Sequence, residues 1–386
     1  MFTALWLLLL LFSYLGYPLL MRILSQRKSL NQFEYYESKE DLPHLSILMP
    51  IHNEDAVLEE KLESIFENIY DFEKIKIFIG LDDCTDNSLQ IVKQFQDQYP
   101  GIISYVSTLR IGKPEMLNLL YEQCKTRSGL LVFTDANVFF MRDTLYELSK
   151  YFKDIRVGLV DTKYYLSKDI ISHEQENDYL SYELKLKYQE GVVWGVMQGP
   201  FGGCFVIRKE LFEKIPPKFL VDDFFIGMNV MKKGYYSIQN PAAVVLENVN
   251  TTWQEEFKRK KRIAIGNFQN LNYFSFIFSK PFTALCTSWF FHKVIRWLLP
   301  VLIIPSILID YVLAFWFPLN IWPVTITLIL IIVILWLQYV LQRVTLQSKT
   351  ITRLSYFIYV NIALLSGFFI YLKGIKSNVW EPTNRK

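Results

Sequence analysis

The stretch Leu45-Ser46-Ile47-Leu48-Met49-Pro50-Ile51-His52-Asn53-Glu54 decides the fold. Its short apolar run ends at a proline, which predicts a buried strand, and the polar residues that follow predict a loop. Residues 55–69 then carry apolar side chains at helical spacing, at Val57, Leu58, Leu62, Ile65 and Phe66. A strand, a loop and a helix in this order form the first unit of an α/β fold.

The same alternation continues along the chain. Apolar runs predict strands over residues 75–81, 102–106 and 130–134, and helical spacing predicts helices over residues 86–95 and 114–124. We therefore expect an α/β fold with a mostly parallel sheet and helices on both faces. Ligands bind such sheets beyond the carboxyl ends of the strands. Three polar clusters stand there: His52-Asn53-Glu54, Asp82-Asp83 and Asp135-Ala136-Asn137.

Uncharged runs flank this region. Residues 2–20 and 354–372 carry no charged side chain, and residues 297–342 carry only Asp310. A helix of about 20 apolar residues crosses a bilayer, so each run is long enough to span it. The middle run is broken by Pro318, Asn320 and Pro323 and predicts two spans, at residues 297–316 and 321–341.

Flanking charges predict the orientation of these spans. Arg22, Arg27 and Lys28 follow the first run, so the positive-inside rule places the next domain in the cytosol. Four spans would put the basic C-terminal tail outside, against the same rule. In the alternative interpretation one run is interfacial or re-entrant, and the side of the tail stays open. We expect a multi-pass protein of the cell membrane with a large cytosolic domain.

Five parts of the chain are predicted from these patterns. They are an N-terminal transmembrane anchor at residues 1–22, the cytosolic domain at 42–240, interfacial basic and aromatic helices at 241–292, a transmembrane region of about three spans at 293–373 and a tail at 374–386. The basic run at 257–262 has two interpretations. It is either an anchor at the lipid headgroups or part of a catalytic motif.

Charge and cysteine content exclude some classes of protein. The chain has 41 Lys and Arg against 38 Asp and Glu in 386 residues, and this balance predicts no nucleic-acid partner. The four cysteines, Cys84, Cys124, Cys204 and Cys286, form no CxxC pair. Their spacing predicts neither a zinc site nor a disulfide framework, which suits a reducing compartment.

Each polar cluster has a structural and a functional interpretation. Asp82 ends a buried strand, where a base or ribose could supply the donors that its carboxylate needs, whereas a turn with an N-cap explains its neighbours. Asp135 and Asn137 follow a strand, where they either form an ordinary turn or bind one divalent cation that also binds a diphosphate. Lys113, after Gly112, is a candidate cation near phosphates.

Two further segments have the same double interpretation. Asp222 and Asp223 precede an apolar helix. In one interpretation they only stabilise the positive end of the helix dipole, and in the other they include a general base whose pKa is raised by burial. Gly199-Pro200-Phe201-Gly202-Gly203 predicts a loop that lets the backbone approach a ligand closely. Gly202 and Gly203 are therefore candidate acceptor contacts.

In this order, the clusters resemble the membrane-bound branch of the family-2 glycosyltransferases, which are inverting enzymes with a GT-A fold that use nucleotide sugars. The resemblance covers about residues 42–275. Met49-Pro50-Ile51-His52-Asn53-Glu54 is similar to the family motif Pro-x-Tyr/His-Asn-Glu. It implies a place in the nucleotide pocket for Pro50, His52, Asn53 and Glu54.

The resemblance also implies individual roles. Asp82 matches the acid that contacts uracil, with Asp83 at a position where the family has Gly. Gly112-Lys113 is similar to an element near the nucleotide, and Asp135-Ala136-Asn137 is similar to the DxD metal motif with Asn for the second Asp. Asp222-Asp223 resembles the Glu-Asp segment whose second acid is the general base.

A last motif departs from the family pattern. Arg262 matches the Arg of QxxRW, which is associated with the diphosphate, but Arg259 replaces the Gln and Ile263 replaces the Trp. Loss of the Trp removes a surface on which an acceptor sugar stacks. The departure favours single or few sugar additions over processive synthesis.

The implied function is an inverting, hexosyltransferase-type glycosyltransferase of polysaccharide biosynthesis. It would move a sugar from a nucleoside diphosphate sugar, with UDP the expected nucleotide, to a lipid-linked or exported glycan acceptor at the membrane. The implied cofactor is Mg²⁺ or Mn²⁺ on Asp135 and Asn137, and the implied catalytic residues are Asp223, Asp222 and Arg262.

Two alternatives come from other classes of protein. The first is a catalytically inactive, membrane-tethered partner subunit that binds sugar nucleotides, which the Asn137 and Ile263 departures favour. The second is a transporter with a cytosolic regulatory domain. The small number of predicted spans and the single intramembrane acid, Asp310, weigh against it.

Overall fold

The computed structural model describes residues 2–166, 174–248, 253–316, 333, 349–375 and 377. Two compact units make up the chain. The smaller unit consists of Met1–Leu20, Thr252–Phe282 and Cys286–Gly374, and the larger unit of Met21–Thr251, Thr283–Leu285 and Ile375–Lys386.

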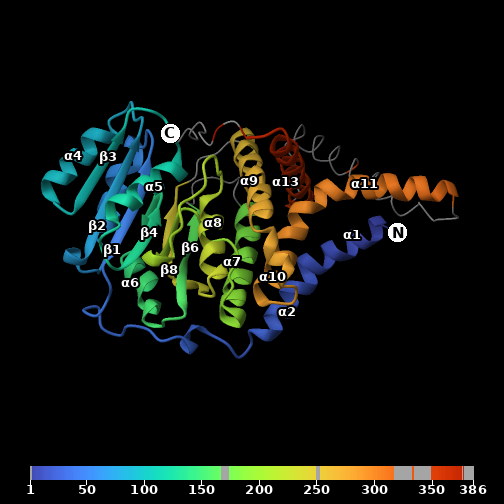
Figure 1. The fold of residues 1–386 in the computed structure, drawn as a ribbon, viewed down its shortest axis with the longest axis horizontal. Helices are drawn as coiled ribbons and strands as arrows, with labels where there is room; N and C mark the ends of the chain where they lie inside the picture. Colours follow the sequence, from blue (N-terminus) through green and yellow to red (C-terminus); the bar gives the residue numbers. More distant parts are fainter. Residues whose placement is uncertain are drawn as a thin grey trace. The chain divides into compact units, whose positions relative to one another are not determined.

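An eight-stranded sheet forms the centre of the larger unit (Figure 1). Its strands are β1 Leu45–Ile51, β2 Ile75–Asp82, β3 Ile102–Ser107, β4 Leu130–Thr134, β5 Val138–Phe140, β6 Val157–Leu166, β7 Cys204–Arg208 and β8 Tyr236–Glu247. Their order in the sheet is β3-β2-β1-β4-β7-β6-β8-β5. β7 pairs antiparallel with β4 and β6, β5 pairs antiparallel with β8, and the other neighbours are parallel. Because β5 and β7 alone run against the other strands of this sheet, the expected mostly parallel sheet is confirmed.

Helices connect and cover these strands. They are α3 Asp55–Phe66, α4 Ser88–Gln98, α5 Lys113–Cys124, α6 Thr144–Ser149, α7 Glu174–Trp194 and α8 Asp222–Lys232. Each strand and helix expected between residues 45 and 134 is present, with ends that differ by a few residues. β7 inserts between β4 and β6 and pairs antiparallel with both, and this position makes the sheet mixed.

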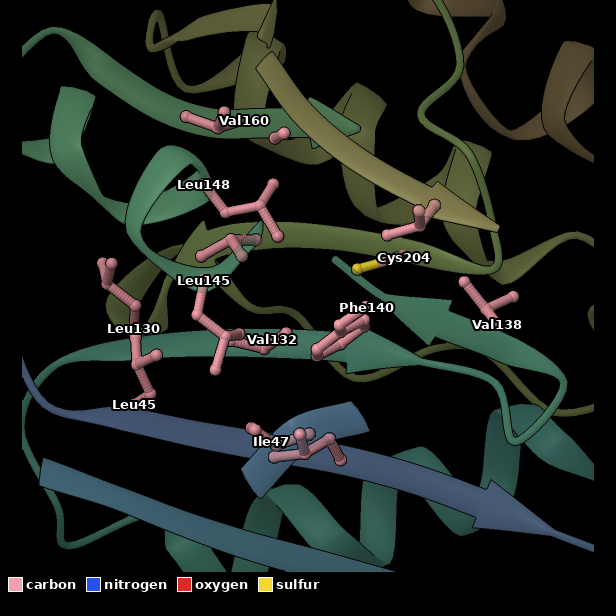
Figure 2. Close-up of a cluster of buried hydrophobic side chains, with 14 of the residues drawn as sticks. Leu45, Ile47, Leu130, Val132, Val138, Phe140, Leu145, Leu148, Val160 and Cys204 are labelled. Carbon is pink, nitrogen blue, oxygen red and sulfur yellow. The ribbon is translucent and has the colours of Figure 1, made fainter. Parts of the chain in front are cut away.

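The core lies on both faces of the sheet, as alternating strand residues require. Leu45, Ile47 and Met49 of β1 join one buried cluster, whereas Leu48 between them is equally buried but lies outside that cluster. Figure 2 shows part of the cluster, in which side chains of β1, β4 and β5 meet Leu145 and Leu148 of α6. Full burial of one such side chain contributes about 1.5–3 kcal/mol.

Strand register places the polar clusters at one edge of the sheet. Ile51 of β1 pairs with Leu81 of β2, and Leu48 pairs with Phe133 of β4. These parallel strands therefore end close together, and the residues that follow them emerge at the same edge.

The smaller unit consists of helices in its described residues. They are α1 Phe2–Leu11, the π-helix Phe12–Gly16, α9 Trp253–Tyr273, the π-helix Trp289–Val294, α11 Ile295–Trp316 and α13 Lys349–Leu372, while α2 Tyr17–Leu24 and α10 Ala284–Ser288 extend across the boundaries between the units. The carboxylate of Asp310 accepts from the Phe2 and Thr3 N–H groups, each at 2.9 Å, and so satisfies the first turn of α1.

Two described helices are long and apolar enough to cross a membrane, at Phe2–Leu24 and Ser355–Leu372. A bent pair, Ala284–Ile303 and Pro305–Ala314, would make a third span if it counts as one. These helices support membrane association. Apart from residue 333, the span expected at residues 321–341 lies outside the described residues, as does most of the tail. The expected start of interfacial helices at residue 241 is wrong, because β8 continues to Glu247.

Candidate active site

Asp82, the last residue of β2, is almost fully buried and is held by one loop. Its Oδ2 accepts from Arg110 Nη1 at 2.7 Å and from the Gly112 N–H at 2.9 Å, and its Oδ1 accepts from the Ile111 N–H at 2.8 Å. Hydrogen bonds to a charged acceptor are about twice as strong as neutral ones. The donors that this carboxylate needs thus come from residues 110–112, and its contact with uracil stays a prediction.

His52 follows β1 and contacts the end of β2. Its Nδ1 lies 2.6 Å from the carbonyl oxygen of Asp82, which can only accept, so Nδ1 carries the proton. Nε2 lies 3.4 Å from Nδ2 of Asn53 and accepts from it in the neutral imidazole. Asn53 and Asp83 both adopt the left-handed region, with φ of 53° and 55°. A glycine at position 83, as in the family motif, would adopt this conformation without strain.

The β1–α3 and β2–α4 turns are bonded to each other. The Glu54 N–H donates to Ser88 Oγ at 3.1 Å, and the Asp55 N–H donates to Asp86 Oδ2 at 2.9 Å. Pro50, in register with Gly80, precedes this region in β1. The structure therefore brings Pro50, His52, Asn53, Glu54 and Asp82 to one end of the sheet edge.

Lys113, the first residue of α5, links this region to the other predicted acids. Its Nζ donates to Asp135 Oδ1 at 2.7 Å and to the Gly202 carbonyl at 3.0 Å, and lies 3.8 Å from Asp222 Oδ2. Burial acts to lower the pKa of Lys113, but the carboxylates of Asp135, Asp222 and Asp223 outweigh it and raise that pKa. One cation thus lies among three acids from two separate parts of the chain.

Asp223 stands in the first turn of α8 and has a pKa raised to about 6. Burial is the largest cause, and the negative charge of Asp222 adds to it. Lys113, Lys187 and the Phe224 N–H, which donates to Oδ1 at 2.7 Å, act in the opposite direction. A carboxylate with this pKa is still ionised at neutral pH and is a stronger base than an ordinary aspartate. Its role as the general base stays a prediction.

The glycine loop before β7 packs directly against Asp223. A Cβ at Gly202 would lie 2.5 Å from Asp223 Oδ2, so any other residue here would displace the carboxylate. A Cβ at Gly203 would lie 2.5 Å from the ring of Phe201. The Gly203 carbonyl also accepts from the Asp135 N–H at 3.0 Å. The loop therefore contacts both acids, and acceptor binding by Gly202 and Gly203 stays a prediction.

Asp135 and Asn137 fit the divalent cation that the resemblance implies. Asn137 is buried, and its Nδ2 donates to the Asn248 carbonyl at 3.1 Å. Its Oδ1 is buried without a hydrogen-bond partner among the described residues, which leaves an amide oxygen available to a hard cation. No group of three or more His, Cys, Asp and Glu side chains gathers as a metal site in that part of the chain. A cation here would take one or two protein ligands, as Mg²⁺ commonly does when it also binds phosphates.

Arg262, the predicted diphosphate contact, lies in α9 and belongs to the smaller unit. In the same helix, Glu256 pairs with Arg259 at 2.8 Å and with Lys260 at 3.1 Å. Part of the basic run is therefore neutralised by its own helix. The catalytic role of Arg262 stays a prediction.

A buried ion pair that the sequence motifs did not indicate lies behind the glycine loop. Asp161 of β6 is fully buried, and it accepts from Lys187 Nζ at 3.0 Å and from the Phe201 N–H at 2.8 Å. The pair thus anchors the residue before Gly202. An acid within the apolar run Val157-Gly158-Leu159-Val160-Asp161 was the available signal.

Two other basic residues were also missed. Arg110 stands three positions before Lys113 and binds Asp82. Lys61 lies on the apolar side of the expected helix over residues 55–69, at positions i+3 from Leu58 and i−4 from Ile65. A lysine at such a position is unusual, because that side of the helix faces the core.

Known proteins are similar to this chain in sequence. The family described as Glycosyl transferase family 21 matches residues 8–345. "Probable glycosyltransferase YdaM" of Bacillus subtilis (strain 168) is 23% identical over 243 residues, which are 61% of this chain and 57% of that protein. "Minor teichoic acid biosynthesis protein GgaA" of the same organism is 27% identical over 110 residues, 28% of this chain and 25% of that protein. The chain thus spans less than two thirds of the length of either relative.

A solved structure is similar in fold. Mannosyltransferase PcManGT from Pyrobaculum calidifontis, in complex with GDP-Man and Mn²⁺, has a TM-score of 0.65 and 19% sequence identity. The match covers 95% of this chain and 99% of that chain. It confirms the expected GT-A type of fold. The glycosyltransferase assignment is confirmed by the family match, while the narrower assignments to family 2 and to hexosyl transfer stay predictions.

Proposed function

The chain belongs to glycosyl transferase family 21, and from this premise we propose that it is an inverting, membrane-associated transferase that uses a nucleoside diphosphate sugar. The observation that carries the proposal is the cluster around Lys113. It combines a candidate phosphate cation, the strand-end acid Asp135 and the Asp222-Asp223 pair. The expected acceptor is lipid-linked or is an exported glycan, because apolar helices accompany the sheet domain.

One end of the sheet edge would bind the nucleoside of the donor, and the other end would bind its diphosphate. His52, Asn53 and Glu54 would line the nucleoside site, next to the loop that Asp82 holds. Asp135 and Asn137 would hold Mg²⁺ or Mn²⁺, which when bound neutralises the charge of the departing diphosphate. Lys113 would add positive charge at the same phosphates.

Asp223 would be the general base of a single displacement. It takes the proton from the acceptor hydroxyl as that oxygen attacks the anomeric carbon from the side opposite the diphosphate. The bond between the anomeric carbon and the diphosphate oxygen breaks, and its electron pair leaves with the nucleoside diphosphate. One such displacement inverts the anomeric configuration. The raised pKa of Asp223, about 6, supports this assignment because it brings the carboxyl closer to neutral pH.

A donor screen on the full chain in detergent tests the proposal. UDP-sugars and GDP-sugars are both included, since the similar mannosyltransferase was solved with GDP-Man and Mn²⁺. We expect acceptor-dependent release of one nucleoside diphosphate with lipid-linked acceptors, its loss with EDTA and its return with added Mg²⁺ or Mn²⁺.

A second candidate function is favoured by one observation. At position 137 an acid would give the metal site one more negative charge than the amide of Asn137 does. The missing charge suits a partner subunit that binds sugar nucleotides without turnover. Calorimetric nucleotide binding with no release across the donor and acceptor panel would support the subunit and contradict the transferase.

A further inference from the structure

Lys61 of α3 is a charged residue that the proposed chemistry does not use. Its side chain is fully buried, with 0% of its surface exposed. Burial lowers its pKa to about 7, although Cys204 and Asp135 act in the opposite direction. An apolar side chain of the same length would fill this space without the cost of removing an ammonium group from water. The lysine must therefore provide bonds that an apolar residue cannot.

Those bonds go to both ends of a single turn. Lys61 Nζ donates to Thr134 Oγ1 at 2.9 Å and to the Val138 carbonyl, and it lies 3.5 Å from the centre of the Phe140 ring. Thr134 ends β4 and Val138 begins β5, so the ammonium group bridges the two strands next to the turn of residues 135–137. Figure 2 shows Val138, Phe140 and Cys204 in the apolar cluster of this region.

The bridge extends to the residue that carries the strand-end acid. Thr134 Oγ1 lies 3.3 Å from the Asp135 carbonyl, to which it donates while it accepts from Lys61. On the far side of the turn, the Asn137 amide is fixed by the Asn248 carbonyl. Both predicted metal ligands thus stand on a backbone that Lys61 ties to α3.

We propose that Lys61 is a positioning residue, which fixes the turn of residues 134–138 and thereby aims the oxygens of Asp135 and Asn137 at a shared divalent cation. The inference rests on the metal site of the proposed function. Groups that orient metal ligands typically change metal affinity by about 10- to 100-fold when they are removed.

The test compares two buried lysines. Lys61→Met removes the bridge, and Lys209→Met is the matched control. Lys209 is 6% exposed, and its Nζ donates to the Cys124 and Arg127 carbonyls, which belong to none of the predicted site residues. The full chain in detergent is titrated with Mn²⁺, alone and with UDP, and unbound Mn²⁺ is measured by electron paramagnetic resonance. Thermal unfolding is measured on the same samples.

We expect both variants to unfold at lower temperature but only Lys61→Met to bind Mn²⁺ about 10- to 100-fold more weakly. Sugar transfer by Lys61→Met should then be regained in part at high Mn²⁺ concentration. Wild-type Mn²⁺ affinity in Lys61→Met, or an equal loss of affinity in Lys209→Met, would overturn the inference.

A milder variant decides the matter if Lys61→Met does not fold. Thr134→Val keeps the shape of the side chain and removes the hydroxyl between Lys61 and the Asp135 carbonyl. Weaker Mn²⁺ binding by this variant supports the inference, and unchanged binding overturns it. Absence of Mn²⁺ binding by the wild-type chain would overturn both the inference and the metal site of the proposed function, whereas a failure confined to the variants leaves the proposed function standing.

Discussion

Two Asp-Asp pairs lie near the edge of the same sheet domain and have different environments. In Leu81-Asp82-Asp83 the first acid is bound by Arg110 and two backbone N–H groups, and the second adopts the left-handed conformation of a turn. In Val221-Asp222-Asp223 both acids begin a helix and lie near Lys113, and burial raises the pKa of the second acid.

The same dipeptide therefore has two different environments, one that fixes a loop and one that raises the pKa of a carboxyl group. The carboxylate of Asp82 accepts from Arg110 and from two backbone N–H groups, so it fixes the loop of residues 110–112. Burial raises the pKa of Asp223 and the negative charge of Asp222 adds to it, whereas the backbone donor at 2.7 Å acts in the opposite direction, so the carboxylate binds protons more strongly than an ordinary aspartate does. We expect the Asp82 pair to govern stability and nucleotide binding, and the Asp223 pair to govern the rate.

Asp223→Asn should give the largest effect. It removes the proposed base while keeping the shape of the side chain, and we expect transfer to fall by about 10²- to 10⁴-fold with nucleotide affinity retained. Single-turnover transfer and calorimetric nucleotide binding measure the two quantities. Asp83→Asn, in the other pair, is the control and should transfer normally. Normal transfer by Asp223→Asn would end its assignment as the base.

Gly202→Ala should come next, because the added Cβ would lie 2.5 Å from Asp223 Oδ2. A displaced base costs up to about 100-fold in rate, since misplacement of reacting groups by about 1 Å has effects of that size. Thermal unfolding should change little. Gly101→Ala is the control, because the nearest atom to its added Cβ would be 3.4 Å away. Equal rates in the two variants would show that the glycine loop does not constrain Asp223.

Asp82→Asn should act on the other end of the edge. The amide replaces one acceptor oxygen with a donor group that faces Arg110 or a backbone N–H, and each buried donor left without a partner costs about 1–3 kcal/mol. We expect a lower free energy of unfolding and weaker nucleotide binding, because the loop before Lys113 loosens. Denaturant unfolding and calorimetry measure these effects. The control Asp83→Gly, at φ 55°, should be as stable as the wild type or more stable.

The pH dependence should give the smallest effect. With the Asp223 pKa at about 6, transfer should fall by about tenfold per unit below pH 6 as the base becomes protonated. Asp222→Asn should shift this decline in the transfer rate to lower pH, because it removes the neighbouring negative charge and so lowers the pKa of Asp223. A pH profile of the transfer rate that is unchanged in Asp222→Asn would contradict the coupling of the two acids.

The same group predicts how stability changes with pH. An unfolded aspartate has a pKa of about 3.9, so between about pH 4 and 6 the folded chain keeps a proton that the unfolded chain has lost. The contribution of Asp223 to stability therefore falls as pH rises through that window. Asp223→Asn should make the fall of stability with pH less steep, as measured by thermal unfolding from pH 4 to 7.

Much of the first half of the sheet domain could be predicted from the sequence. The apolar runs that form β1 to β4 and the helical spacing of α3 to α5 depend on local periodicity, which neighbouring residues determine. The edge position of His52, Asp82 and Asp135 follows, because parallel strands end together. The insertion of β7 between β4 and β6 could not be predicted, since pairing between distant strands leaves no local pattern.

Local sequence patterns were enough to predict which polar side chains stand at the strand ends and which runs are apolar enough to cross a membrane. The folded chain then determines that Arg110 and two backbone N–H groups bind Asp82, whereas burial raises the pKa of Asp223. These contacts join distant positions: Arg110 lies 28 positions from Asp82, and Lys113 lies 22 positions from Asp135 and 109 from Asp222. The physical reason is that the ionisation of a carboxylate depends on the donors, charges and water around it, and long-range folding sets all three.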